Sequence, residues 1–160
     1  MQMFVDRKDS LRRDYNIRDN GIEVSLKKQR PQLALPMPAF GEVLCKVRDK
    51  CKDDFETVLD EMNRLIDNGT VIPCYLKNAV DTFRIAKDLS AVMDDDRDQI
   101  SPMDALIVAS AVTNPNCTIL YTTDSQLLSI SLPDSAVDWR ADNGCKSLAV
   151  RSILDIIKAR

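Results

Sequence analysis

The chain has 160 residues, of which 44% are apolar and 29% are charged, and its formal net charge is −3. This composition is typical of a globular protein and excludes a disordered or collagen-like chain, and the small net charge argues against a general polyanion binder. The absence of histidine excludes Ser-His-Asp and Cys-His catalysis and most zinc hydrolase sites.

Other motifs are missing as well. The five cysteines form no C-x-x-C pair, so a closed zinc site is not expected, and their odd number and irregular spacings argue against a disulfide framework. The sequence contains no GxGxxG and no GxxxxGK[ST], which argues against a phosphate-cradling loop. No apolar run approaches the ~20 residues of a membrane span, and residues 1–9 lack a signal-peptide core. We therefore expect a cytoplasmic protein with no membrane association, in a reducing environment.

The N-terminal part predicts two short strands and a helix. Residues 3–5 form an apolar run that predicts a strand ending at Asp6. Residues 7–30 are charged and mixed, with more basic than acidic side chains, and indicate either a phosphate-contacting end or a solvated face. Residues 32–35 predict a second strand, and apolar residues at helical spacing follow Pro38.

The middle of the chain predicts two helices. An apolar stripe over residues 55–66 repeats with the period of a helix, and Asn68-Gly69 predicts its end. Residues 71–73 predict a short link, and a second apolar stripe over 76–92 predicts the next helix. The three acids at 94–96 predict a solvated loop, with metal chelation as the lesser alternative.

The stretch that begins at Ser101 carries the clearest local signals. Ser101 and Asp104 stand at the spacing of a capping box, with a proline at the first helical position. Residues 105–112 are apolar nearly all round, which predicts a buried helix. Residues 118–123 are β-branched and apolar, which predicts a buried parallel strand.

The last part of the chain shows weaker patterns. Residues 126–128 predict a helix or turn directly after the strand at 118–123. Residues 133–144 predict a loop, and residues 147–159 predict a closing amphipathic helix.

This alternation of strands and helices predicts an α/β fold with a central parallel sheet. Ligands bind at the carboxyl ends of the strands in such sheets. Asp6 and Asp124 follow predicted strands, and Glu42 and Asp104 lie in the first turns of predicted helices. The four acids could converge at one edge of the sheet. Each also has a local alternative: a turn residue for Asp6, a solvated helix face for Glu42, and a helix cap for Asp104 and Asp124.

The sequence resembles the PIN-domain family. The resemblance rests on the run SPMDALIVASA from Ser101 and the run ILYTTD that ends at Asp124, with FVD ending at Asp6 and FGEV around Glu42. It covers roughly residues 3–128, which leaves 129–160 as an extension that closes a single domain over 1–160. The resemblance implies a three-layer α/β/α fold with a short-stranded central parallel sheet.

What the resemblance implies for function is a metal-dependent endoribonuclease. PIN domains are RNA nucleases, and many are VapC-type toxins of toxin–antitoxin pairs. The family holds Mg²⁺ or Mn²⁺ with four acids, which match Asp6, Glu42, Asp104 and Asp124 here, and Thr122 matches its accompanying hydroxyl. Oxygen ligands suit such hard cations, which relieve the repulsion among neighbouring carboxylates. The implied partners are RNA, an antitoxin protein and a second copy of the chain.

The residues after Asp6 depart from the family pattern. Where the family has a small residue and then Asn, Ser or Thr, this chain has Arg7 and Lys8. The lysine could replace a cation, steer a phosphate or point outwards. Arg7 and Lys8, together with Arg12 and Arg13, either contact RNA or form a solvated surface. Two alternatives follow: a catalytically weakened PIN-like scaffold that binds RNA or protein, and a binding module whose acids are only caps.

Overall fold

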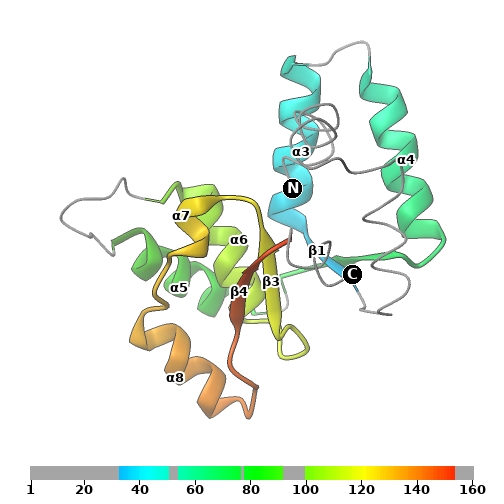
Figure 1. Cartoon of the computed structure of the whole chain (residues 1–160). Helices are drawn as coiled ribbons and strands as arrows, with labels where there is room; N and C mark the ends of the chain where they lie inside the picture. The colour runs from blue at the N-terminus through cyan, green and yellow to red at the C-terminus, as the bar shows by residue number, and fades with distance from the viewer. Residues whose placement is uncertain (1–32, 51–53, 77, 92–99, 154–160) are drawn as a thin grey trace. The chain divides into compact units, whose positions relative to one another are not determined.

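A computed structural model of the chain describes residues 33–50, 54–76, 78–91 and 100–153 (Figure 1). The chain divides into two compact units. The first unit contains the described residues 33–50, 54–74 and 152–153, and the second unit contains the described residues 75–76, 78–91 and 100–151. The strand expected over 3–5, the basic residues that follow it and the acids at 94–96 lie outside the described residues. The single domain expected over 1–160 stays a prediction.

The first unit contains two parallel strands joined by two helices. Its elements are β1 (Leu33–Pro36), α3 (Met37–Lys50), α4 (Phe55–Asp67) and β2 (Val71–Cys74). β1 pairs with β2 in parallel, with Leu33 opposite Val71. The expected strand and both expected helices are confirmed. The link expected at residues 71–73 is wrong, because these residues form β2; a four-residue run that contains a proline carries little strand signal of its own.

The core of the first unit lies between its helices. Val43 and Val47 are one helical turn apart on α3, and they are buried together with Met62 of α4. Helix α4 ends as the sequence predicts: the Asn68 N–H donates to the Arg64 carbonyl at 3.1 Å, and Gly69 has a φ of +71°. Glycine adopts this left-handed conformation without a steric penalty, so the chain turns directly into β2.

The second unit contains four helices and a two-stranded sheet. Its elements are α5 (Ala79–Ala91), α6 (Pro102–Val112), β3 (Ile119–Thr122), α7 (Ser125–Leu128), α8 (Asp134–Asp142) and β4 (Ala149–Ser152). β3 pairs with β4, and the Ala149 N–H donates to the Thr118 carbonyl at 3.0 Å, which joins the starts of the two strands.

Helix α6 is the centre of the second unit. Ala105, Val108 and Val112 are fully buried, as the nearly continuous apolar sequence predicts, and α5 packs along the helix. On α5, the predicted burial of the apolar stripe is confirmed only in part. Ile85 and Leu89 are buried, whereas Val80 and Phe83 are exposed by 83% and 57%.

Two expectations near the end of the chain are wrong. Residues 133–144 were expected to form a loop, but Asp134–Asp142 form α8, which buries Ala136, Trp139 and Arg140. A buried arginine gives no apolar signal, so the sequence pattern of this helix is weak. The helix expected over 147–159 is wrong at 149–152, which form β4. This strand depends on pairing with β3, a contact between distant residues that local periodicity does not report.

The described residues thus form a mixed α/β protein with short strands in two small sheets. This confirms the α/β class predicted from the alternation of strands and helices. Among the helices that the structure describes, none is long and apolar enough to cross a bilayer.

Candidate functional site

Asp104 lies in the first turn of α6, where a capping box holds it. The Ser101 Oγ accepts a hydrogen bond from the Asp104 N–H at 3.1 Å and donates to Asp104 Oδ2 at 2.6 Å. Pro102 fits the first helical position because its missing N–H would have no partner there. The local sequence therefore fixes both the backbone and one carboxylate oxygen of Asp104.

Asp124 stands directly after β3, at the cap of α7. Its Oδ1 accepts a hydrogen bond from the Gln126 N–H at 2.7 Å, and its own N–H donates to Thr122 Oγ1 at 3.0 Å. Thr122 is buried, with 8% of its surface exposed. The capping alternatives for both aspartates are thus confirmed as geometry, and a cap leaves the second oxygen of each carboxylate available.

The second oxygens of these two aspartates determine what they can do chemically. Asp104 Oδ1 and Asp124 Oδ2 accept no hydrogen bond from the described residues, and neither carboxylate pairs with a lysine or arginine of that part of the chain. Both side chains are half-buried. Carboxylate oxygens of this kind are suitable ligands for Mg²⁺ or Mn²⁺, which prefer oxygen.

The four predicted acids are distributed over different parts of the chain: Asp104 and Asp124 lie in the second unit, Glu42 in the first, and Asp6 outside the described residues. Within residues 33–50, 54–76, 78–91 and 100–153, no three Asp, Glu, Cys or His side chains are grouped closely enough to hold a metal ion. Glu42 belongs to the first unit, where it lies on α3 and forms an ion pair with Lys46 one turn along. Asp6 and the basic residues Arg7, Lys8, Arg12 and Arg13 lie outside the described residues.

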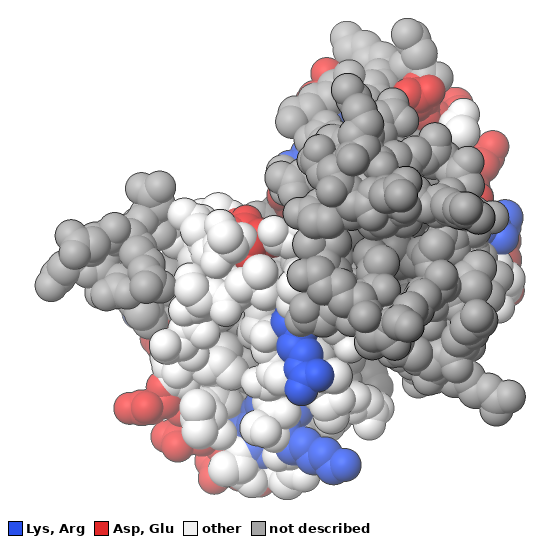
Figure 2. Space-filling model, viewed as in Figure 1, with Lys and Arg blue, Asp and Glu red and all other residues white. Residues whose placement is uncertain are grey.

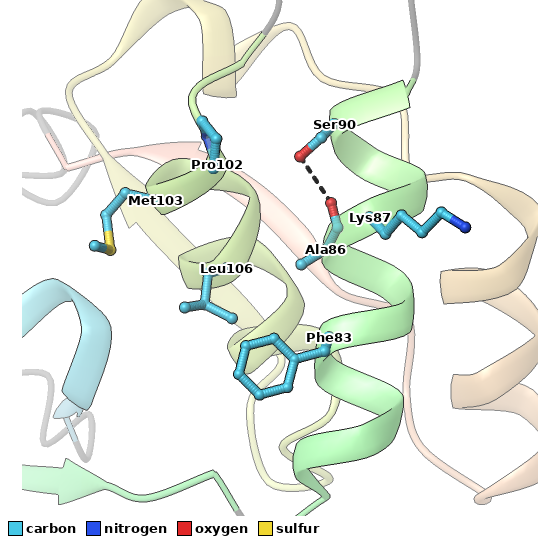
Figure 3. A pocket seen from close by; sticks show the side chains of 7 residues that line it. All are labelled: Phe83, Ala86, Lys87, Ser90, Pro102, Met103 and Leu106. Carbon is cyan, nitrogen blue, oxygen red and sulfur yellow. Dashed lines mark hydrogen bonds between the residues drawn. The ribbon is translucent and has the colours of Figure 1, made fainter.

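A hollow on the surface of the second unit was not predicted from the sequence. It has a volume of about 360 Å³ and lies between α5 and α6 (Figure 3). Figure 3 shows Phe83 of α5 and Leu106 of α6 pointing toward each other, while Lys87 points away from Met103. Its lining is mainly apolar, and the described surface around the second unit carries mostly uncharged side chains in the view of Figure 2. The sequence gives no signal for this hollow, because Phe83 belongs to an apolar stripe that predicts burial.

The second feature missed by the sequence analysis is Arg140. It is a charged residue with only 3% of its surface exposed, and it lies in the last turn of α8. No residue pattern marks an arginine as buried, because the property depends on carbonyl groups contributed by other elements.

Comparison with protein-family models, with curated proteins and with solved structures finds no match for this chain.

Proposed function

We propose that the protein is a Mg²⁺- or Mn²⁺-dependent endoribonuclease of the PIN type. One observation carries the proposal: Asp104 and Asp124 are each held by a cap that uses one carboxylate oxygen and leaves the other without a partner among the described residues. If these aspartates were only helix caps, they would not need to match the PIN motifs. A metal site, in contrast, needs carboxylates whose orientation is fixed before the metal binds.

The proposal extends to the fold. In the part of the chain that the structure describes, β1 pairs only with β2, and β3 pairs only with β4. The resemblance to the PIN domain implies a central parallel sheet with a further strand. Residues 3–5 are the proposed strand, which would complete the central parallel sheet of a three-layer α/β/α domain. Asp6 would then end at the carboxyl edge of that sheet, as Asp124 does on β3.

In this proposal the reaction is hydrolysis of an RNA phosphodiester. Water attacks the phosphorus in line with the leaving O3′, the P–O3′ bond breaks, and the products are a 5′-phosphate and a 3′-hydroxyl. A bound divalent cation supplies a more acidic water and neutralises charge that grows on the phosphate. Asp6, Glu42, Asp104 and Asp124 would hold the cation. Ser101 orients the Asp104 carboxylate, and Thr122 fixes the backbone of Asp124.

The first test measures thermal unfolding while Mn²⁺ or Mg²⁺ is added to the wild type and to Asp104→Asn. A ligand that binds only the folded state stabilises it by about 2.7 kcal/mol at a hundredfold excess over Kd. Asparagine retains a capping side chain but lacks the charge, so its stabilisation should be much smaller. Asp134→Asn is the matched control, because Asp134 also lies in the first turn of a helix, α8.

Cleavage assays on single-stranded RNA complete this test. Metal-dependent cleavage by the wild type and the Asp134→Asn variant, with loss in Asp104→Asn, is the expected result. A wild type that neither gains stability in millimolar metal nor cleaves RNA would contradict the proposed nuclease.

A second candidate is a PIN-like scaffold with weakened catalysis that binds RNA or protein. Two observations favour it: Arg7 and Lys8 follow Asp6, and Val80 and Phe83 expose apolar surface on α5. Stabilisation by metal without RNA cleavage would support this candidate over the nuclease.

The proposed partners are RNA, an antitoxin and a second copy of the chain. Arg7, Lys8, Arg12 and Arg13 are the proposed RNA contacts. Replacing Arg12 and Arg13 by glutamine should weaken RNA binding and reduce the salt dependence of that binding. RNA binding that is unchanged in affinity and in salt dependence would assign these residues to a solvated surface.

A further inference from the structure

Arg140 is a buried cation that is surrounded by backbone carbonyl groups. Its Nη1 donates to Val112 O at 2.8 Å and lies 3.4 Å from Ala111 O and Asn114 O. Its Nη2 donates to Cys117 O at 2.7 Å, and its Nε donates to Lys146 O at 2.5 Å. No carboxylate of the described residues forms an ion pair with it. A buried charge without a counter-ion is costly, so a chain keeps one only where many dipoles compensate it.

The carbonyl groups that Arg140 contacts come from three separate places. Ala111 and Val112 are the last residues of α6, where the helix dipole presents its negative end. Asn114 and Cys117 lie in the loop from α6 to β3, and Lys146 lies in the loop from α8 to β4. A guanidinium has five donors in a rigid plane, so one side chain links the end of α6 to the loops that precede β3 and β4.

These hydrogen bonds link α6, which carries Asp104, to the loop before β3, and Asp124 follows β3. Asp104 lies eight residues before Val112, which is about 12 Å along the helix axis. A tilt of α6 by about 5° about its C-terminal end would move the Asp104 carboxylate by about 1 Å relative to β3 and Asp124. Metal and catalytic sites tolerate errors of only about 0.5 Å, so a displacement of this size matters.

We infer that Arg140 is a positioning residue, which holds α6 against β3 so that Asp104 and Asp124 keep a fixed separation. The inference rests on the proposed metal site for its functional meaning. Its structural content, the fixed placement of α6 against β3, can be measured without any metal.

The test compares Arg140→Lys with Trp139→Phe. Lysine keeps the charge but cannot reach the separate carbonyl groups. Trp139 is the preceding residue of α8, and its Nε1 donates to Asp81 of α5 at 2.9 Å, so its variant disturbs the same helix without touching the carbonyls that Arg140 binds. The readouts are the amide NMR shifts of Asp104 and Gln126, the dissociation constant for Mn²⁺ and kcat for RNA cleavage.

We expect Arg140→Lys to shift both amide resonances, to weaken Mn²⁺ binding by at least about tenfold and to lower kcat by about 100-fold. Trp139→Phe should do none of these at a comparable loss of Tm. If Arg140→Lys loses Tm but keeps both amide shifts and the Mn²⁺ affinity of the wild type, Arg140 is only a structural residue. If the wild type binds no Mn²⁺, the proposed function fails, and the amide shifts still decide the positioning role.

A measurement on the wild type covers the case in which Arg140→Lys does not fold. Hydrogen exchange of the Arg140 Nε–H should then be as slow as that of the α6 and β3 amides, because all three open together. Exchange as fast as that of the exposed Arg84 would overturn the inference.

Discussion

At the scale of single residues, two hydroxyl groups set the geometry of the candidate aspartates. Ser101 contacts a residue three positions away, and Thr122 contacts one two positions away. Such short-range hydrogen bonds depend on neighbouring residues in the sequence, which is why the capping box could be predicted. The sequence did not reveal that each cap occupies only one carboxylate oxygen.

Ser101→Ala tests the capping box. Alanine can neither accept from the Asp104 N–H nor donate to its carboxylate, so the free energy of unfolding should fall by about 1 kcal/mol. Urea unfolding monitored by Trp139 fluorescence measures this loss, because Trp139 belongs to the same unit. Ser131→Ala, at an exposed serine before α8, should change stability by less than about 0.5 kcal/mol. Equal effects of the two changes would show that the cap contributes nothing.

At the scale of elements, the helices follow the sequence more closely than the strands do. Helices α4 and α6 begin and end near the predicted positions, because their apolar stripes lie within each helix and Ser101 and Gly69 lie within two residues of a helix end. The described strands have four residues each, too few for alternation to be distinguished from chance. β2 and β4 were therefore missed, and each is defined by a partner far away in the sequence.

Two glycines of the first unit predict opposite effects of the same substitution. Gly69 has a φ of +71°, so Gly69→Ala should lower the free energy of unfolding by about 1 kcal/mol or more. Gly41 lies inside α3, and an added Cβ there would meet no atom within 4 Å. Gly41→Ala should therefore raise stability by up to about 1 kcal/mol. Urea unfolding monitored by far-UV circular dichroism compares both variants, and effects of the same sign would contradict these assignments.

At the scale of the whole molecule, the proposed single domain over residues 1–160 can be tested by unfolding. A single domain should unfold in one transition, so both units should unfold together. Trp139 is the single tryptophan and reports on the second unit, whereas far-UV circular dichroism reports on both units.

We therefore expect the unfolding midpoints from tryptophan fluorescence and circular dichroism to coincide. Val5→Ala should lower both midpoints together, by about 2 kcal/mol, because it removes apolar atoms from the proposed central strand. Val137→Ala, at a position that is 53% exposed, should change stability by no more than about 0.5 kcal/mol. Two separate transitions would contradict the proposed single domain, and no effect of Val5→Ala would contradict the proposed strand over residues 3–5.

The candidate site was predictable only in part. The sequence marked Asp104, Thr122 and Asp124 through their local motifs, and the structure describes how each is held. Glu42 was marked by a weaker motif, and its ion pair with Lys46 follows from helical spacing that could have been noticed. The role of Asp6 stays a prediction.

Sequence patterns alone predict the α/β class, the ends of α4 and α6, and the caps at Asp104 and Asp124. These features depend on contacts within a few residues, so the local pattern contains the information. Tertiary contacts define the strands at 71–74 and 149–152, the exposure of Val80 and Phe83, and the burial of Arg140. Each of these depends on groups brought together from distant parts of the chain, as the carbonyls of α6 and of two loops are at Arg140.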